Sequence, residues 1–272
     1  MSYKLIFVAA DTLPDLSYDN WQWVEEGKAG FTVIDQEISI ANINALREKF
    51  DANKIDVFCV PENGPEKKLF LADMDSTIVT SETLDELADE AGIKEKIAAI
   101  TERAMRGELD FHDALRERID LLKGLPTSAL DKTLVDTKVS EGGSVLLTGL
   151  KTKNIHCVLV SGGFTFFTSA IANQLGFDNH HGNILDISNG VLNGTVSEPI
   201  LDKDSKLTYL KEYATQEQCE LENTIAIGDG ANDLPMLENA GLGIGYHPKP
   251  LVRENILNCI IHTDLTSVLY LI

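Results

Sequence analysis

Short apolar runs alternate with helical patterns along most of the chain. Leu69 to Ala72 is one such run, and similar runs occupy 156–160, 224–227, 242–246 and 259–262. Apolar runs of this length are typical of strands that are buried on both faces of a parallel sheet. Segments with helical spacing lie between them, at 143–153, 165–175 and 205–213. The alternation predicts an α/β fold with a Rossmann-like, mostly parallel sheet.

A different pattern follows the first of these runs. Apolar residues recur at helical spacing in four consecutive segments, 81–91, 93–105, 111–123 and 128–135. We expect Thr80 or Ser81 to cap the first helix and Gly92 to end it. Four consecutive helices cannot form a layer of the sheet. They predict a helical cap, residues 81–137, inserted beside the end of the first core strand.

The opening segment, residues 1–66, forms a pattern of its own. Apolar runs at 3–10, 31–34 and 55–60 indicate strands, and 39–50 has the spacing of a helix with Ser39 as its cap. The sequence PENGP, at 61–65, reads as a linker. We therefore expect a small α+β domain of unknown role. A homodimer contact through it stays open. The catalytic core would then comprise residues 67–80 and 138–272.

Two details of the core concern the region before residue 200. Asn-Gly pairs at 189–190 and 193–194 predict two turns of an antiparallel flap. His180 and His181 resemble a metal-binding pair, but Asn and Gly residues surround them. We expect these histidines to lie in a solvent-exposed loop.

Composition limits the class of partner. Hydrophobic residues make up 43% of the 272 residues, enough for a folded core. The net charge of −20 argues against nucleic acid, which is bound through Lys and Arg contacts to phosphate. No stretch approaches the roughly 18 apolar residues of a membrane span, so no membrane partner is expected. The four cysteines form no CxxC pair, and a signal peptide is not evident; we expect a cytoplasmic protein.

Polar motifs follow three of the predicted strands: DMDST at 73–77, SGG at 161–163 and GDGAND at 228–233. The carboxyl ends of parallel strands meet at one edge of a sheet, where ligands bind. Phosphoryl transfer would use such a set, because a carboxylate can attack phosphorus and oxygen ligands suit Mg²⁺. The three motifs therefore predict one phosphoryl-transfer site.

Each motif has an expected role in that chemistry. Asp73 is the predicted nucleophile, and Asp75 is the predicted general acid and base. We expect Mg²⁺ to bind at Asp73, Asp229 and Asp75, the last through a nearby backbone carbonyl, with Asp233 supporting the ion from behind.

Phosphate oxygens need donors as well as a metal. The Ser161 hydroxyl and the N–H groups of Gly162 and Gly163 suit them. Lys206 would add fixed positive charge, with Lys203 as its alternative.

At this level of detail the sequence resembles a known family. DMDST, Ser161, Lys206 and GDGAND match, in order, the four motifs of the haloacid dehalogenase-like (HAD) phosphatases. Over residues 67–262, including VSGGF and GDGANDLPML, the pattern is similar to that of the phosphoserine phosphatases. The resemblance implies Mg²⁺-dependent hydrolysis of O-phospho-L-serine, the last step of serine biosynthesis, through an aspartyl phosphate.

The resemblance also implies how the substrate is recognised. Glu82 would receive the substrate ammonium, and Arg118, with Arg116 as its competitor, would receive the carboxylate. Arg can hold a carboxylate with two parallel hydrogen bonds. Further contacts would come from Met105 and Phe111 on the cap side and from Asn232 near the phosphate.

Two other functions stay open at this point. The same aspartyl phosphate would serve a phosphotransferase, or a phosphatase acting on another small phosphorylated metabolite. A third reading is a sensor that binds phosphoserine or serine through the N-terminal segment without turnover. The complete set of acidic residues argues against that reading.

Overall fold

The computed structural model describes residues 2–36 and 38–272, apart from the side chains of Met105 and Lys203. Its central sheet has six parallel strands in the order β12-β11-β10-β5-β6-β7. In chain order these are β5 (Leu69–Asp73), β6 (His156–Phe164), β7 (Asn179–Asn183), β10 (Thr224–Gly228), β11 (Leu242–Tyr246) and β12 (Asn258–Ile260). The predicted α/β fold with a parallel sheet is confirmed.

Helices cover both faces of this sheet. On one side are α6 (Gly143–Thr152), α7 (Thr165–Leu175) and the 3-10 helix η4 (Leu265–Leu271); on the other are α8 (Lys203–Gln216), α9 (Leu234–Asn239) and α10 (Pro250–Asn255). Residues of β5 alternate between the two clusters: Phe70 and Ala72 belong to the first, Leu69 and Leu71 to the second. This alternation explains why β5 is apolar at every position before Asp73.

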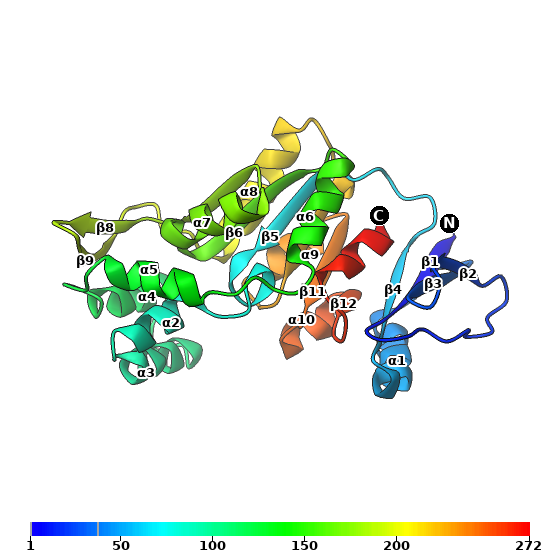
Figure 1. Cartoon of the computed structure of the whole chain (residues 1–272), viewed down its shortest axis with the longest axis horizontal. Coiled ribbons are helices and arrows are strands. Elements are labelled where there is room, and N and C mark those ends of the chain that lie inside the picture. The colour runs from blue at the N-terminus through cyan, green and yellow to red at the C-terminus, as the bar shows by residue number, and fades with distance from the viewer. Residues whose placement is uncertain (1, 37) are drawn as a thin grey trace.

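The predicted cap consists of α2 (Thr83–Glu90), α3 (Lys94–Met105), α4 (Phe111–Asp120) and α5 (Ser128–Asp136). A hairpin of β8 (Leu185–Ser188) and β9 (Val191–Val196) lies against it, at one end of the molecule (Figure 1). Leu192 exchanges backbone hydrogen bonds with the α4–α5 connection, donating to Leu125 and accepting from Gly124. Residues 185–196, which the expected division put in the core, therefore pack with the cap.

Three local expectations were wrong. Asn189-Gly190 forms the hairpin turn, with positive φ at both residues, but Asn193-Gly194 lies inside β9. Helix α2 has Glu82 as its N-cap, without a side-chain cap hydrogen bond, in place of Thr80 or Ser81. His180 and His181 lie in β7 and are half-buried. The segment expected to be a loop is instead the strand at one edge of the sheet.

The N-terminal unit is a four-stranded antiparallel sheet in the order β2-β3-β1-β4, with one helix. Its elements are β1 (Tyr3–Ala9), β2 (Gln22–Glu25), β3 (Ala29–Ile34), α1 (Ile40–Phe50), the 3-10 turn η1 (Asp51–Asn53) and β4 (Ile55–Pro61). Strand β2 was not expected, since its exposed residues carry no period-two pattern. Ile6, Val8 and Phe58 belong to the same apolar cluster as the core. The unit thus packs directly on the catalytic core, on the side away from the cap (Figure 1).

A buried carboxylate joins the two units. Asp56 of β4 is 1% exposed and accepts hydrogen bonds from the backbone N–H groups of Ile261, His262 and Thr263, at 2.9–3.2 Å, and from Thr263 Oγ1 at 2.6 Å. These donors follow β12, beside which β4 lies. Nearby, Arg47 of α1 donates to the carbonyl of Leu257.

Among the described residues, no helix has both the length and the apolar character needed to span a bilayer.

We predict that Asp56→Ala lowers the free energy of unfolding by about 3 kcal/mol, because several buried donors lose their acceptor together. Urea denaturation followed by circular dichroism measures this loss. The matched control is Asp51→Ala, which removes an exposed carboxylate that contacts the side chain of the same His262 and should change stability by less than about 0.5 kcal/mol. Equal losses in the two variants would contradict the role given to Asp56.

Candidate active site

The three motif-bearing strand ends meet at one edge of the sheet. Asp73 is the last residue of β5 and pairs in register with Val160 of β6, while Ala72 pairs with Ile227 of β10. Ser161 and Asp229 therefore flank Asp73. A cavity of about 190 Å³ opens here between core and cap, lined by Asp73, Asp75, Glu82, Phe111, Arg118, Gly162, Asp229, Asn232 and Lys249, among others. Residues expected to act together are thus brought to one cavity.

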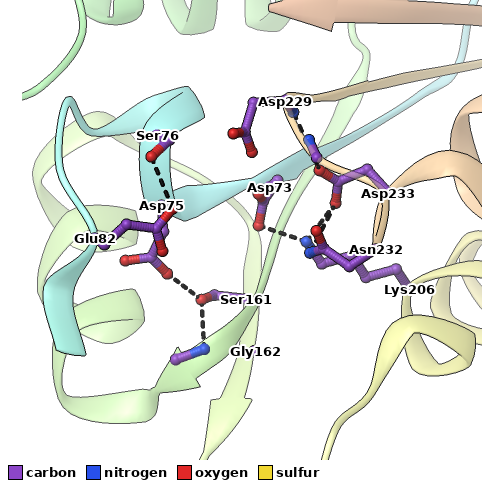
Figure 2. Close-up of polar contacts among 12 residues, drawn as sticks. Asp73, Asp75, Ser76, Glu82, Ser161, Gly162, Lys206, Asp229, Asn232 and Asp233 are labelled. Carbon is purple, nitrogen blue, oxygen red and sulfur yellow. Dashed lines mark hydrogen bonds and ion pairs between the residues drawn. The ribbon is translucent and has the colours of Figure 1, made fainter. Parts of the chain in front are cut away.

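Three buried carboxylates and one lysine form the floor of the site. Asp73, Asp229 and Asp233 each offer an oxygen within 4.8 Å of the others. Lys206, in the first turn of α8, places Nζ 2.5 Å from Asp73 Oδ1 and 2.5 Å from Asp233 Oδ1 (Figure 2). Lys206 is buried with them, so two carboxylates share one cation away from solvent.

Burial and charge shift the pKa values of these groups. Burial, followed by the nearby Asp233, raises the pKa of Asp73 well above its usual range, and Lys206 opposes that shift. Burial also raises the pKa of Asp229. Burial alone would lower the pKa of Lys206, but Asp233 and Asp73 outweigh it and raise that pKa. These shifts reflect a floor in which three carboxyl groups meet a single buried lysine.

Asp233 also shapes the loop after β10. Its Oδ2 accepts the N–H groups of Asp229 at 3.1 Å and Gly230 at 2.9 Å. Gly228 must be a glycine, since a Cβ there would lie 2.5 Å from the Asp233 carboxyl group. One oxygen of Asp233 thus fixes the loop that carries Asp229, while the other binds Lys206.

Asp75 faces the other side of the site, toward the cap (Figure 2). Its Oδ1 accepts the N–H and hydroxyl of Thr83, both at 2.8 Å, and its Oδ2 accepts the hydroxyl of Ser161 at 2.6 Å. Ser161 Oγ in turn accepts the N–H of Gly163 at 2.7 Å. The chain can turn this sharply because Ser76 adopts a positive φ of 55°.

One of these contacts differs from the sequence-based expectation. The Asp75 carboxylate is engaged with Thr83 and Ser161, and the three carboxylates that cluster are Asp73, Asp229 and Asp233, so the expected metal contact through a backbone carbonyl near Asp75 stays a prediction. The N–H of Gly163, expected to face phosphate, is used by Ser161. Gly162 lines the cavity, and its contact with phosphate stays a prediction.

The carboxylate cluster fits a hard divalent cation. All its ligand atoms are oxygens, which Mg²⁺ prefers, and its excess negative charge is what such a cation would balance. Both oxygens of Asp233 already have partners, so Asp73 and Asp229 are better placed to hold the ion directly.

The cap contributes a carboxylate and a guanidinium. Glu82 Oε1 accepts the Ser76 hydroxyl at 2.9 Å, and burial, with Asp75 nearby, raises the pKa of Glu82. Arg118 is half-buried in the cavity wall, donates Nε–H to the carbonyl of Ala114 at 3.2 Å and has its pKa lowered by burial. Its competitor Arg116 is exposed and pairs with Glu198 at 2.7 Å. The geometry therefore favours Arg118.

Phe111 and Asn232 line the same cavity, and Phe111 is 42% exposed. The Met105 and Lys203 side chains lie outside the described residues, so their expected roles stay predictions.

Sequence reasoning missed three contributors. Thr83 holds Asp75, Asn183 donates Nδ2–H to the carbonyl of Gly162 at 2.7 Å, and Lys249 lies 2.9 Å from Asp229. The only local signal was the pair of prolines around Lys249, which fixes the backbone there.

The sequence of this chain is similar to those of known proteins. The model of the haloacid dehalogenase-like hydrolase family matches residues 70–238. Phosphoserine phosphatase of Streptococcus thermophilus is 43% identical over 203 residues, which are 75% of this chain and 94% of that protein. Phosphoserine phosphatase of Archaeoglobus fulgidus is 42% identical over 77% of this chain, and the match spans 61% of that longer protein.

This chain belongs to the phosphoserine phosphatases of the haloacid dehalogenase-like hydrolase family.

Solved structures extend the likeness to this family. A phosphoserine phosphatase structure described as a phospho-aspartyl intermediate analogue has a TM-score of 0.70 and 39% identity, over 76% of this chain and 99% of that one. A HAD family hydrolase from Salmonella enterica serovar Typhi has a TM-score of 0.89 and 30% identity, over 100% of this chain and 98% of that one. The match to the Salmonella hydrolase covers the N-terminal unit as well, so that protein has the same unit as this chain.

We predict that Lys206→Met lowers the free energy of unfolding at pH 8, without divalent cations, by about 3–5 kcal/mol, because Asp73 and Asp233 lose their shared cation. Lys206 opposes the rise in the pKa of Asp73, so its removal should raise that pKa further and let the folded variant take up a proton at higher pH than the wild type does. The variant regains stability as that proton binds, so the loss should be smaller at pH 5 than at pH 8. Urea denaturation at pH 8 and pH 5 measures both effects.

The control is Lys211→Met, an exposed lysine on the same helix. A loss for Lys206→Met that matched the control, or that did not change with pH, would be inconsistent with the buried charge cluster.

Proposed function

We propose that this protein hydrolyses O-phospho-L-serine to L-serine and phosphate, with Asp73 as the nucleophile. One observation carries the proposal: a single cavity offers a partner for each charged group of that substrate. In the cavity, Asp73 and Asp229 suit the metal ion that accompanies the phosphate, Glu82 suits the ammonium and Arg118 suits the carboxylate. Lys206 lies behind them, bound to Asp73. The likeness to a phosphoserine phosphatase structure described as substrate-bound, at 39% identity and a TM-score of 0.70, supports it.

In the first step, Asp73 attacks phosphorus. Lys206 holds Oδ1 of Asp73, which orients the carboxylate and leaves Oδ2 as the attacking atom. The new bond joins Asp73 oxygen to phosphorus, and the bond between phosphorus and the serine oxygen breaks. The aspartyl phosphate divides one difficult displacement into two easier ones.

Asp75 moves the protons in both steps. It gives a proton to the departing serine oxygen, and it then takes a proton from the water that attacks the aspartyl phosphate. Its hydrogen bonds to Thr83 and Ser161 keep the carboxyl group in one orientation beside the reacting atoms. This restriction favours catalysis because less freedom is lost when the transition state forms.

Phosphate oxygens would be bound by the Ser161 hydroxyl, the Gly162 N–H, Asn232 and Lys206. Mg²⁺ held by Asp73 and Asp229, with Asp75 contributing its backbone carbonyl and Asp233 behind them, would supply the charge that lets an anionic nucleophile approach a phosphate. Asn183 holds Gly162 in place by donating Nδ2–H to the Gly162 carbonyl, and its Oδ1 accepts the N–H of Leu201 at 2.8 Å.

The proposal divides labour between the parts of the chain. The core, residues 67–80 and 138–272, carries the chemistry, and the cap, residues 81–137, recognises the amino acid. Residues 1–66 form the N-terminal domain, where a homodimer contact stays a prediction. We place the reaction in the cytoplasm, at the last step of serine biosynthesis; the free thiols of Cys157, Cys219 and Cys259 are typical of a reducing compartment.

A panel of phosphorylated metabolites, assayed for phosphate release with Mg²⁺, tests the proposed function. Phosphoserine should give the highest kcat/KM, and Asp73→Asn should reduce its turnover by at least about 10³-fold with an unchanged circular dichroism spectrum, since the near-isosteric amide cannot attack phosphorus. A phosphorylated sugar or alcohol preferred over phosphoserine would refute the substrate. Substantial turnover by Asp73→Asn would refute the nucleophile.

For substrate recognition, we predict that Arg118→Ala raises KM for phosphoserine about 10- to 100-fold, the value of a charge-assisted hydrogen bond to the carboxylate. KM for p-nitrophenyl phosphate, which has no carboxylate, should change little. Arg116→Ala is the matched control and should alter both KM values less than about threefold, because its partner Glu198 is exposed. A similar rise for both substrates in Arg118→Ala would exclude a specific contact with the carboxylate.

A further inference from the structure

Lys249 reaches into the active site from the core side. Its Nζ lies 2.9 Å from Asp229 Oδ2 and 3.8 Å from Glu82 Oε1. Its side chain is 58% exposed, and it lines the cavity together with both carboxylates. One ammonium group therefore faces a carboxylate of the floor and a carboxylate at the entrance to the cap.

The backbone of Lys249 is fixed to the same loop. Its N–H donates to the carbonyl of Asp229 at 2.9 Å, and its carbonyl accepts the N–H groups of Val252 and Arg253 in the first turn of α10. Pro250 follows directly, which restricts Lys249 to extended backbone; its φ and ψ are −60° and 155°. The side chain thus starts from a rigid point beside Asp229.

Exposed lysines usually make ion pairs of little value. Lys249 differs because its partner is buried: the Asp229 side chain is only 7% exposed, and burial raises its pKa. Among the residues that the structure describes, Lys249 is the only side-chain donor recorded for the Asp229 carboxylate. The lysine therefore determines how that carboxylate is oriented.

We propose that Lys249 is a positioning residue for the metal site. It holds one oxygen of Asp229, so that the other is presented to a divalent cation beside Asp73. The inference rests on the proposed function, which assigns Mg²⁺ to these carboxylates.

Two effects of Lys249 on cation binding oppose each other. Its positive charge repels a divalent cation, but water screens a half-exposed ammonium, so removing the charge should improve affinity no more than about fivefold. Loss of a partner that orients a metal ligand usually weakens affinity about 10- to 100-fold. Positioning outweighs repulsion, so removal of the lysine should weaken Mg²⁺ binding.

Isothermal titration calorimetry with Mg²⁺ alone tests the inference on the full-length protein. Lys249→Met should raise Kd about tenfold or more, whereas Lys249→Arg, which can still donate to Asp229, should stay within about threefold of wild type. Lys132→Met is the matched control: it also removes one positive charge and one exposed ion pair, with Glu90 at 2.7 Å, but on the cap. Its Kd should not change.

The outcomes separate this inference from the proposed function. Wild-type protein that binds no Mg²⁺ would overturn the metal assignment and the inference together. Wild-type binding with equal or tighter binding by Lys249→Met would overturn the inference alone. A loss in Lys132→Met as large as that in Lys249→Met, or an arginine variant as weak as the methionine variant, would also overturn it.

Discussion

The active site depends on a buried lysine that two aspartates share. Asp73 ends the central strand, Asp233 lies in the loop after the neighbouring strand, and Lys206 comes from a helix on one face of the sheet. A buried charge without a partner costs several kcal/mol, so these three side chains hold each other in place. Because Asp233 also accepts two N–H groups of its own loop, the same cluster fixes Asp229. The negative charge left over is what suits the cluster to a metal ion.

A second network connects this floor to the cap. The turn that follows Asp73 directs Asp75 toward the first residue of α2, and Ser76 toward Glu82. The proposed nucleophile, the proposed proton-transferring group and the residue proposed to bind ammonium are thus carried by a single stretch of ten residues, 73–82. Such short connections limit relative movement of the chemical and recognition groups, which favours a well-defined substrate orientation. The β8–β9 hairpin, which belongs to the core in sequence, packs on the cap and is hydrogen-bonded to the α4–α5 connection.

The N-terminal unit lies on the opposite side of the core, and its contact with the core is not a loose one. Asp56 is almost fully buried and accepts several hydrogen bonds from the segment after β12, while apolar residues of β1 and β4 join the main apolar cluster. An interface with a buried, fully bonded carboxylate is specific, because separating the units would leave its donors unpaired. The segment after β12 is therefore stabilised by residues distant in sequence.

Local patterns in the sequence were enough for most of the core elements and for the polar residues at the strand ends, but not for β2 or β7. Uninterrupted apolar runs followed by DMDST, SGG and GDGAND identified β5, β6 and β10 and their polar ends, because a strand buried on both faces is apolar throughout and parallel strands end at one edge of the sheet. Contacts between distant segments needed the tertiary structure. The spacing of residues along the chain does not show that Arg118, and not Arg116, faces the cavity, nor that Asp75 binds Thr83 and Ser161. Each of these depends on which surface the cap presents to the core. The same holds for Lys249, whose role depends on a loop that returns to Asp229 from 20 residues away. Sequence alone thus determined which chemistry the chain carries. The packing of the cap, the loops and the N-terminal unit decided which charged groups face one another. Such pairing depends on burial and on the distance between segments, and no local sequence pattern contains that information.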